Sequence, residues 1–146
     1  FAIRLSLGYV DAETEAAIVQ AQGRSHPLEG LAAVASSGDV RELRSAAKDV
    51  RVSKEVQRYI VDLVRATRGA PGVQLGAGPR ASISLTRLAQ GLALVLGEEF
   101  VTPEHVRTLA VPVLAHRLAL DPQAKFAGRT SQAVVSDILA AIPVPA

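Results

Sequence analysis

The chain has 146 residues, enough for one compact domain and too few for a complete multi-lobed enzyme. It contains no cysteine, which excludes a disulfide scaffold, a thiolate metal site and a cysteine nucleophile. Sixteen basic residues against fourteen acidic ones give a net charge of +2, too balanced for a dedicated nucleic-acid-binding protein.

The first eight residues have the pattern of a β-strand. Apolar side chains alternate with smaller or polar ones from Phe1 to Leu7, and Gly8 ends the run. A single strand cannot satisfy its own backbone groups, so its partners are expected either outside this chain or in short pieces such as residues 50–52. Because the sequence also contains no methionine, we expect it to be part of a longer protein.

The remainder of the sequence predicts an α-helical bundle. With only 3 % aromatic residues, the core must be built from Ala, Leu, Val and Ile, which favours closely packed helices. Capping residues and apolar spacings of three and four predict six helices, with an irregular stretch over 24–38. Pro112 is expected to break or kink the fifth helix. The helices are expected at about 11–22, 39–48, 53–68, 79–97, 102–114 and 131–142.

The sequence lacks the common catalytic and membrane patterns. Its three histidines have no metal-ligand spacing, and neither a nucleophile elbow nor a phosphate-binding P-loop is found. We therefore expect no catalytic residue, no metal site and no activity of this chain alone. No apolar run approaches the roughly 18 residues of a membrane span, and no signal-peptide pattern opens the sequence, so a cytoplasmic protein is predicted.

One loop points to a ligand. Gly76 and Gly78 precede Pro79 and Arg80, which places a guanidinium in the first turn of a predicted helix. Helix N-termini attract anions, and an arginine there adds a bidentate donor suited to phosphate. The alternative is an ordinary Gly-Pro turn before a helix, and spacing alone does not decide between them.

The same loop carries a family resemblance. Gly76-Ala-Gly-Pro-Arg-Ala81 resembles the sensor-2 motif of the MoxR family of AAA+ ATPases, whose common form is Gly-Ala-Ser-Pro-Arg-Ala. Further matches follow in the family's order, so the resemblance covers essentially the whole chain. They are Leu7-Gly-Tyr-x-Asp-Ala-Glu, Val52-Ser-x-Glu-Val, Tyr59-Ile-Val-Asp-Leu-Val-Arg-Ala-Thr-Arg68, Phe100-Val-Thr-Pro-Glu-His-Val, Val113-Leu-x-His-Arg-Leu and Ile142-Pro-Val-Pro.

The resemblance implies that this is the carboxy-terminal part of such an ATPase. Residues 1–10 would be the last strand of the α/β core, and residues 11–146 the helical lid. The nucleotide-binding residue would be Arg80, reaching the γ-phosphate of ATP from the loop of Gly76, Gly78 and Pro79. The core would hold ATP and Mg²⁺, so none is expected tightly bound here. Gly78 replaces the usual Ser, which removes a helix cap.

The resemblance also implies partners and a cellular role. MoxR-type ATPases form hexameric rings and are chaperone-like, assisting the assembly or metal-cofactor maturation of client complexes, often with a von Willebrand factor A domain partner. This chain would contact its own core and the neighbouring subunits, without nucleic acid or membrane. The alternative is a freestanding helical interaction or scaffold domain that binds no nucleotide. A DNA-binding regulator is disfavoured by the near-neutral charge.

Overall fold

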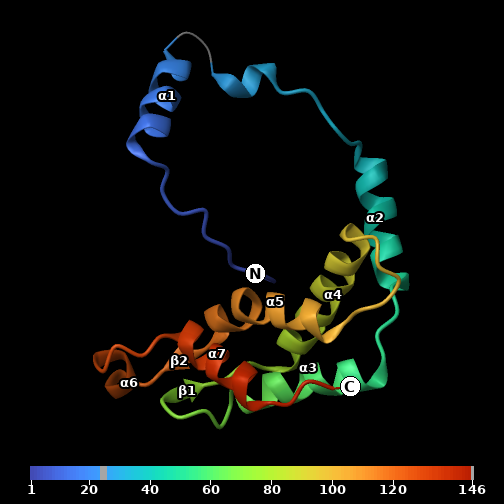
Figure 1. Ribbon diagram of the computed structural model, residues 1–146, viewed down its shortest axis with the longest axis vertical. Coiled ribbons are helices and arrows are strands. Elements are labelled where there is room, and N and C mark those ends of the chain that lie inside the picture. The colour runs from blue at the N-terminus through green and yellow to red at the C-terminus, as the bar shows by residue number, and fades with distance from the viewer. Residues whose placement is uncertain (24–25, 146) are drawn as a thin grey trace. The chain divides into compact units, whose positions relative to one another are not determined.

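A computed structural model describes residues 1–23 and 26–145 of the chain (Figure 1). The chain divides into two compact units. The larger unit combines residues 1–4 with the chain from residue 43 onward, and the smaller unit covers residues 5–42. Each unit is described by itself below.

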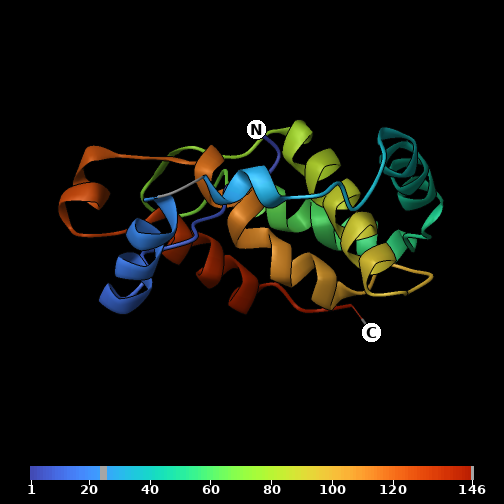
Figure 2. The same cartoon turned by 90° about the horizontal axis from the view of Figure 1, so that it is seen from above.

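The larger unit is built around four helices. They pack around a shared core, with α4 against both α3 and α5, and α7 against α5 (Figures 1 and 2). The four are α3 (Lys54–Ala66), α4 (Pro79–Val95), α5 (Pro103–Leu114) and α7 (Ser131–Ala141). A 3₁₀ turn, η2 (Ala115–Arg117), extends α5, and the short α6 (Pro122–Phe126) precedes α7.

The core consists of small and branched apolar side chains, as the composition predicts. On α4 the buried positions are Ala81, Leu85, Ala89 and Ala93, each at most 1 % exposed. Burial of such side chains is the main favourable term in folding. Alanine at three of these four positions lets the neighbouring helices approach α4 closely.

Polar contacts fix the ends and the spacing of these helices. The Ser53 hydroxyl caps α3 by accepting from the Val56 N–H at 3.2 Å. Arg107 on α5 donates to the Leu139 carbonyl of α7 at 3.1 Å and contacts the Tyr59 hydroxyl of α3 at 3.4 Å. One side chain therefore joins three helices.

The smaller unit has helices, and its described residues form no buried core. It contains α1 (Ala12–Gln22), the 3₁₀ turn η1 (Pro27–Gly30) and the start of α2 (Ser37–Asp49). The carboxylate of Asp11 caps α1, and hydrogen bonds from the backbone N–H and hydroxyl of Thr14 hold its pKa below the ordinary value. Neither α1 nor α2 has a buried residue. These helices are thus stabilised by local hydrogen bonds.

The structure confirms the helical fold class and differs from the sequence prediction in four details. It assigns no strand to residues 1–8, because no other part of the described chain pairs with them. Their role as the last strand of a core sheet stays a prediction. A two-stranded antiparallel sheet, β1 (Val73–Leu75) with β2 (Ala119–Leu120), was not expected. The described residues form seven α-helices rather than six, the addition being α6.

The fourth difference is at Pro112, where the expected break is absent because α5 continues to Leu114, while the kink that was the other expectation stays a prediction. A proline removes one N–H donor from the helix, and packing on both sides of it holds the helix together, since Ala110, Val113 and Leu114 are all fully buried. Within the described residues, no helix is long and apolar enough to cross a membrane.

Candidate functional site

Arg80 lies in the first turn of α4, as predicted. Its side chain is exposed, and it has no hydrogen bond or ion pair with any described residue. Pro79 has no N–H, and the Ala81 N–H donates to the Gly78 carbonyl at 2.9 Å. The main donor to an anion at this helix end is therefore the Arg80 guanidinium, rather than a row of free backbone N–H groups.

The loop before Arg80 is fixed to the end of α3. Thr67, fully buried, donates through its hydroxyl to the Val64 carbonyl at 2.6 Å and accepts from the Ala77 N–H at 2.9 Å. Arg68 donates from Nε to the Ala77 carbonyl at 3.0 Å. Both backbone groups of Ala77 are thus satisfied, which holds the loop in one conformation.

The two glycines of the loop have different reasons to be glycine. A Cβ on Gly76 would lie 2.7 Å from the Arg68 Cα and 2.8 Å from the Thr67 carbonyl oxygen, so only glycine fits there. A Cβ on Gly78 would meet nothing within 4 Å. Gly78 is the N-cap of α4 and provides no side-chain cap, which agrees with the effect expected for a glycine in place of serine.

Arg80 shares a hollow with two more basic side chains. This open hollow of about 580 Å³ is lined by residues from the N-terminus of α4, from η2 and from Phe1. Its nitrogen-bearing side chains are Arg80, His116 and Arg117, and no carboxylate lines it. Arg117 donates to the Phe1 and Ala2 carbonyls, so Arg80 is the side chain of this lining that is left to bind an anion such as phosphate. The lining lacks the carboxylate oxygens that Mg²⁺ prefers.

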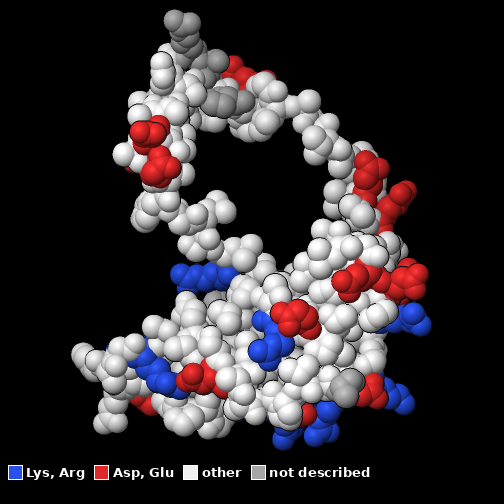
Figure 3. Space-filling view, viewed as in Figure 1, with Lys and Arg blue, Asp and Glu red and all other residues white. Residues whose placement is uncertain are grey.

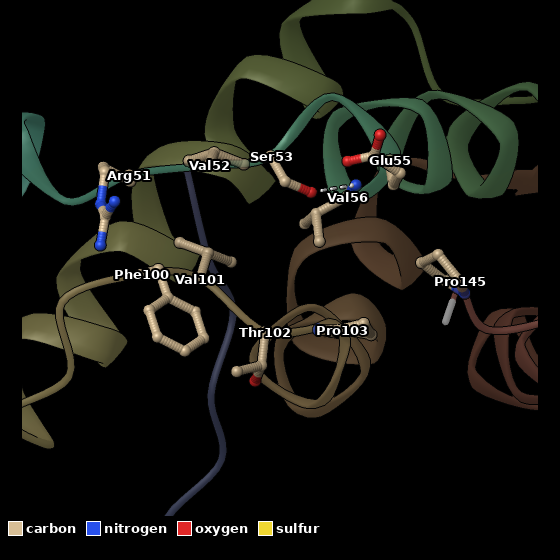
Figure 4. Close-up of a pocket in the computed structure, with 10 residues that line it drawn as sticks. All are labelled: Arg51, Val52, Ser53, Glu55, Val56, Phe100, Val101, Thr102, Pro103 and Pro145. Carbon is tan, nitrogen blue, oxygen red and sulfur yellow. Dashed lines mark hydrogen bonds between the residues drawn. The ribbon is translucent and has the colours of Figure 1, made fainter.

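A second hollow, of about 660 Å³, lies between residues 51–56 and 100–103 and is bordered by Pro145 (Figure 4). Its lining is mainly apolar. The hydroxyl of Ser53 already caps α3, and that of Thr102 contacts the His105 ring at 3.2 Å. Both hydroxyls are therefore engaged at helix starts, and the charged side chains in the lining are Arg51 and Glu55.

Charge and metal-ligand patterns single out no other site. On the face shown in Figure 3, basic and acidic side chains of the larger unit are interspersed rather than gathered into a basic patch. Across the described residues, no group of three or more His, Asp or Glu side chains could hold a metal ion. The hollow around Arg80 is thus the candidate site.

The fold and this hollow together describe a small helical domain that presents an arginine at a helix N-terminus. The model of the AAA lid domain family matches residues 65–138, just over half of the chain and including the loop and α4. The chain belongs to the AAA lid domain family.

Similar proteins place the chain within the AAA+ ATPases. It is 38 % identical over 145 residues to the uncharacterized protein YeaC of Bacillus subtilis and 30 % identical over 154 residues to the chaperone MoxR1 of Mycobacterium tuberculosis. Each match covers 99 % of this chain and 45 % or 40 % of the relative. A crystal structure from Cytophaga hutchinsonii matches the whole chain and 47 % of its own, with a TM-score of 0.88 and 27 % identity.

These matches confirm the predicted resemblance to the MoxR family. The chain is the lid domain of a MoxR-like AAA+ ATPase, and it spans less than half the length of these relatives. The activity and partners of a complete ATPase are therefore proposals for this chain.

The sequence predicted the loop and Arg80 but not what surrounds them. Gly76, Gly78 and Pro79 lie beside Arg80 as neighbours in sequence must. Thr67 and Arg117 were not singled out, because they reach the loop and α4 from other elements. The only sequence signal for them was their place inside motifs shared with the MoxR family.

Proposed function

We propose that this chain is the nucleotide-sensing lid of a chaperone-like AAA+ ATPase, with Arg80 as the sensor-2 residue. The observation that carries the proposal is the state of Arg80, which is exposed, without a partner among the described residues and held at the start of α4 by a rigid loop. Arg87 on the same helix is exposed as well, so exposure by itself does not mark a site. What distinguishes Arg80 is that it directly follows the loop held by Thr67 and lines the hollow with His116 and Arg117.

The residues of the hollow fit the terminal phosphate of ATP. A guanidinium binds phosphate through two parallel N–H···O bonds, and a hydrogen bond to a charged group contributes about 1.5–3 kcal/mol. Arg80 supplies such a donor, and the hollow brings no carboxylate that would repel phosphate. The ligands of Mg²⁺ would have to come from the ATPase core.

The proposed mechanism is a change in lid position between nucleotide states. Arg80 would bind the γ-phosphate, which ATP has and ADP lacks, so the lid would bind more tightly to a core that holds ATP. A ligand shifts a conformational equilibrium only by its differential affinity for the two states. Arg80 provides that difference, and the helical unit behind it would move with it as one body.

The wider role is proposed from the family. The chain would contact its own ATPase core and neighbouring subunits of a hexameric ring in the cytoplasm, with a von Willebrand factor A domain protein as a possible partner and without nucleic acid. One relative is named a chaperone, which supports a chaperone-like role. From the family resemblance we further propose that this role is the assembly or metal-cofactor maturation of client complexes. The alternative remains a helical interaction domain that binds no nucleotide.

Replacing Arg80 tests the proposal. In the ATPase that contains this chain, Arg80→Ala should lower ATP turnover by on the order of 10²-fold, because one preformed donor to the reacting phosphate is lost. The fold should be unchanged, as judged by circular dichroism and melting temperature. Arg87→Ala is the matched control, since Arg87 is an exposed arginine on the same helix. Unaltered turnover in Arg80→Ala would refute the sensor-2 role.

Calorimetry on the 146-residue chain tests whether the lid alone binds ATP. The isolated chain should bind ATP weakly, with a Kd no tighter than about 1 mM, because one or two charge-assisted hydrogen bonds provide only a few kcal/mol. Sub-micromolar affinity would contradict the inference that most of the nucleotide site lies in the core.

A further inference from the structure

The first four residues are bound to the larger unit by their backbone. Arg117 donates from Nη2 to the Phe1 carbonyl at 2.7 Å and to the Ala2 carbonyl at 3.3 Å. The Nε2 atom of His116 lies 3.2 Å from the same Phe1 carbonyl oxygen. The Arg4 N–H donates to the Pro112 carbonyl at 3.0 Å, and Ile3 packs on the core.

Arg117 also contacts the helix that carries Arg80. Its Nη2 lies 3.3 Å from the Ser84 hydroxyl, and Ser84 follows Arg80 by four residues on α4. Residues four apart lie on the same face of a helix. One guanidinium therefore touches both the segment 1–4 and the face of α4 that begins at Arg80.

This arrangement has an energetic cost. The Nη1 atom of Arg117 is buried and has no hydrogen-bond partner among the described residues. A buried donor without a partner is unfavourable, and only the charge-assisted bonds of Nη2 offset it. A solvated arginine on the outside of η2 would avoid the cost, so the position of Arg117 requires an explanation beyond chance packing.

We propose that Arg117, together with His116, is a positioning residue that clamps the segment 1–4 to the face of α4 that carries Arg80. The clamp makes the start of the chain and the sensing arginine move as one unit. The part that concerns nucleotide rests on the proposed function of Arg80. The clamp itself does not, because all of its contacts lie within this chain.

Because the sequence has no cysteine, two introduced cysteines can be labelled without background. Ala2→Cys and Ser136→Cys place spin labels on an exposed residue of the segment and on an exposed residue of α7. Pulsed electron–electron double resonance on this doubly labelled chain should give a narrow distribution of distances between the two labels. Adding Arg117→Gln should broaden it at least about twofold, since the carbonyls of residues 1 and 2 lose their shared donor.

Three further variants define the contacts. Arg80→Gln and Arg87→Gln should keep the narrow distribution, because neither arginine contacts the segment. Ser84→Ala should broaden it less than Arg117→Gln does, since it removes one of the acceptors. If Arg117→Gln does not fold, Arg117→Lys retains the charge but not the forked geometry and should broaden the distribution in its place.

Turnover of the complete ATPase tests the coupling. Arg117→Gln should lower kcat about tenfold while KM for ATP changes less than about twofold, because the variant leaves Arg80 free to bind phosphate but not to move the segment. An unbroadened distribution in Arg117→Gln or Arg117→Lys would overturn the clamp, and an unchanged kcat would overturn the coupling. Unaltered turnover in Arg80→Ala would instead refute the proposed function. It would not affect the clamp, which the distance distribution tests independently.

Discussion

At the scale of single residues, the candidate site depends on groups that do not themselves face a ligand. The Thr67 hydroxyl joins the end of α3 to the Ala77 N–H, and Gly76 allows the loop to pass against the backbone of Arg68. Arg80 follows directly from this loop. The Thr67 hydroxyl and the absence of a Cβ on Gly76 therefore fix the position of the Arg80 backbone.

Substitutions at the two loop glycines should have opposite effects on stability. Gly76→Ala should lower the free energy of unfolding by roughly 1–3 kcal/mol, because its Cβ would overlap the backbone of residues 67 and 68. Gly78→Ser should raise it by a few tenths to about 1 kcal/mol, because the added hydroxyl can cap α4 in open space.

Urea unfolding of the 146-residue chain, followed by circular dichroism, measures both changes. Gly78→Ala is the control, since it adds a Cβ without a capping oxygen. A loss of stability in Gly78→Ser would show that the N-terminus of α4 is shaped differently from this structure.

At the scale of elements, the start of α5 depends on an unusual cap. The Thr102 N–H donates to Nδ1 of His105 at 3.1 Å, and the His105 N–H lies 3.5 Å from the Thr102 hydroxyl, which makes a reciprocal capping box with histidine in the third position. Nδ1 must accept, so the proton is on Nε2, which faces the Glu98 carboxylate at 3.4 Å.

Removing this cap should destabilise the larger unit. His105→Ala should lower the free energy of unfolding by about 1–2 kcal/mol, because it deletes both the capping acceptor and a buried ring that is 5 % exposed. His105→Gln should lose less, since glutamine also completes a capping box. Thermal melts of the unsubstituted chain and of the two variants measure these losses of stability. Equal losses in both variants would show that packing rather than capping explains the role of His105.

Local signals predicted most of these elements. The cap, the acidic first turn and the apolar spacing of α3 lie within one stretch of sequence, as do the Thr102-Pro103 start of α5 and the Pro79 start of α4. The sheet of β1 and β2 was missed because each strand is too short to show a period, and Val73 pairs with Leu120 across the sequence. The continuation of α5 through Pro112 was missed because tertiary packing decides it.

The candidate site, like the elements, was predicted where its residues are contiguous in sequence and missed where they are far apart. Arg80 could be predicted because its loop and its helix start are contiguous in sequence. The contacts of Arg117 with Phe1 and Ser84 join positions more than thirty residues apart, and no local pattern encodes them. The role of Thr67 was hidden for a similar reason, since its acceptor function depends on a loop ten residues away.

At the scale of the whole molecule, the two units differ in burial. The larger unit holds the buried core, whereas the smaller one leaves large apolar side chains exposed, including Tyr9 and Val34. Local stability follows the amount of buried apolar contact. Among its described residues, the smaller unit therefore relies on local hydrogen bonds to resist opening when the chain is alone.

Hydrogen exchange should reveal this difference. In the isolated chain, peptides from residues 9–22 should exchange within seconds, whereas peptides from α4 and α5 should be slowed by at least about 10³-fold. Mass spectrometry of exchange in native buffer measures both in one experiment. Comparable protection of α1 would contradict the absence of a core around it.

The alanines of α4 have a consequence for how this protein can vary. Ala81, Ala89 and Ala93 set the separation between α4 and its neighbours, and Arg80 begins the same helix. One extra methyl group on this stripe would displace the helix axis and carry the guanidinium with it. The position of the Arg80 guanidinium therefore depends on buried alanine side chains, and a substitution at one of them would move Arg80 without touching the candidate site itself.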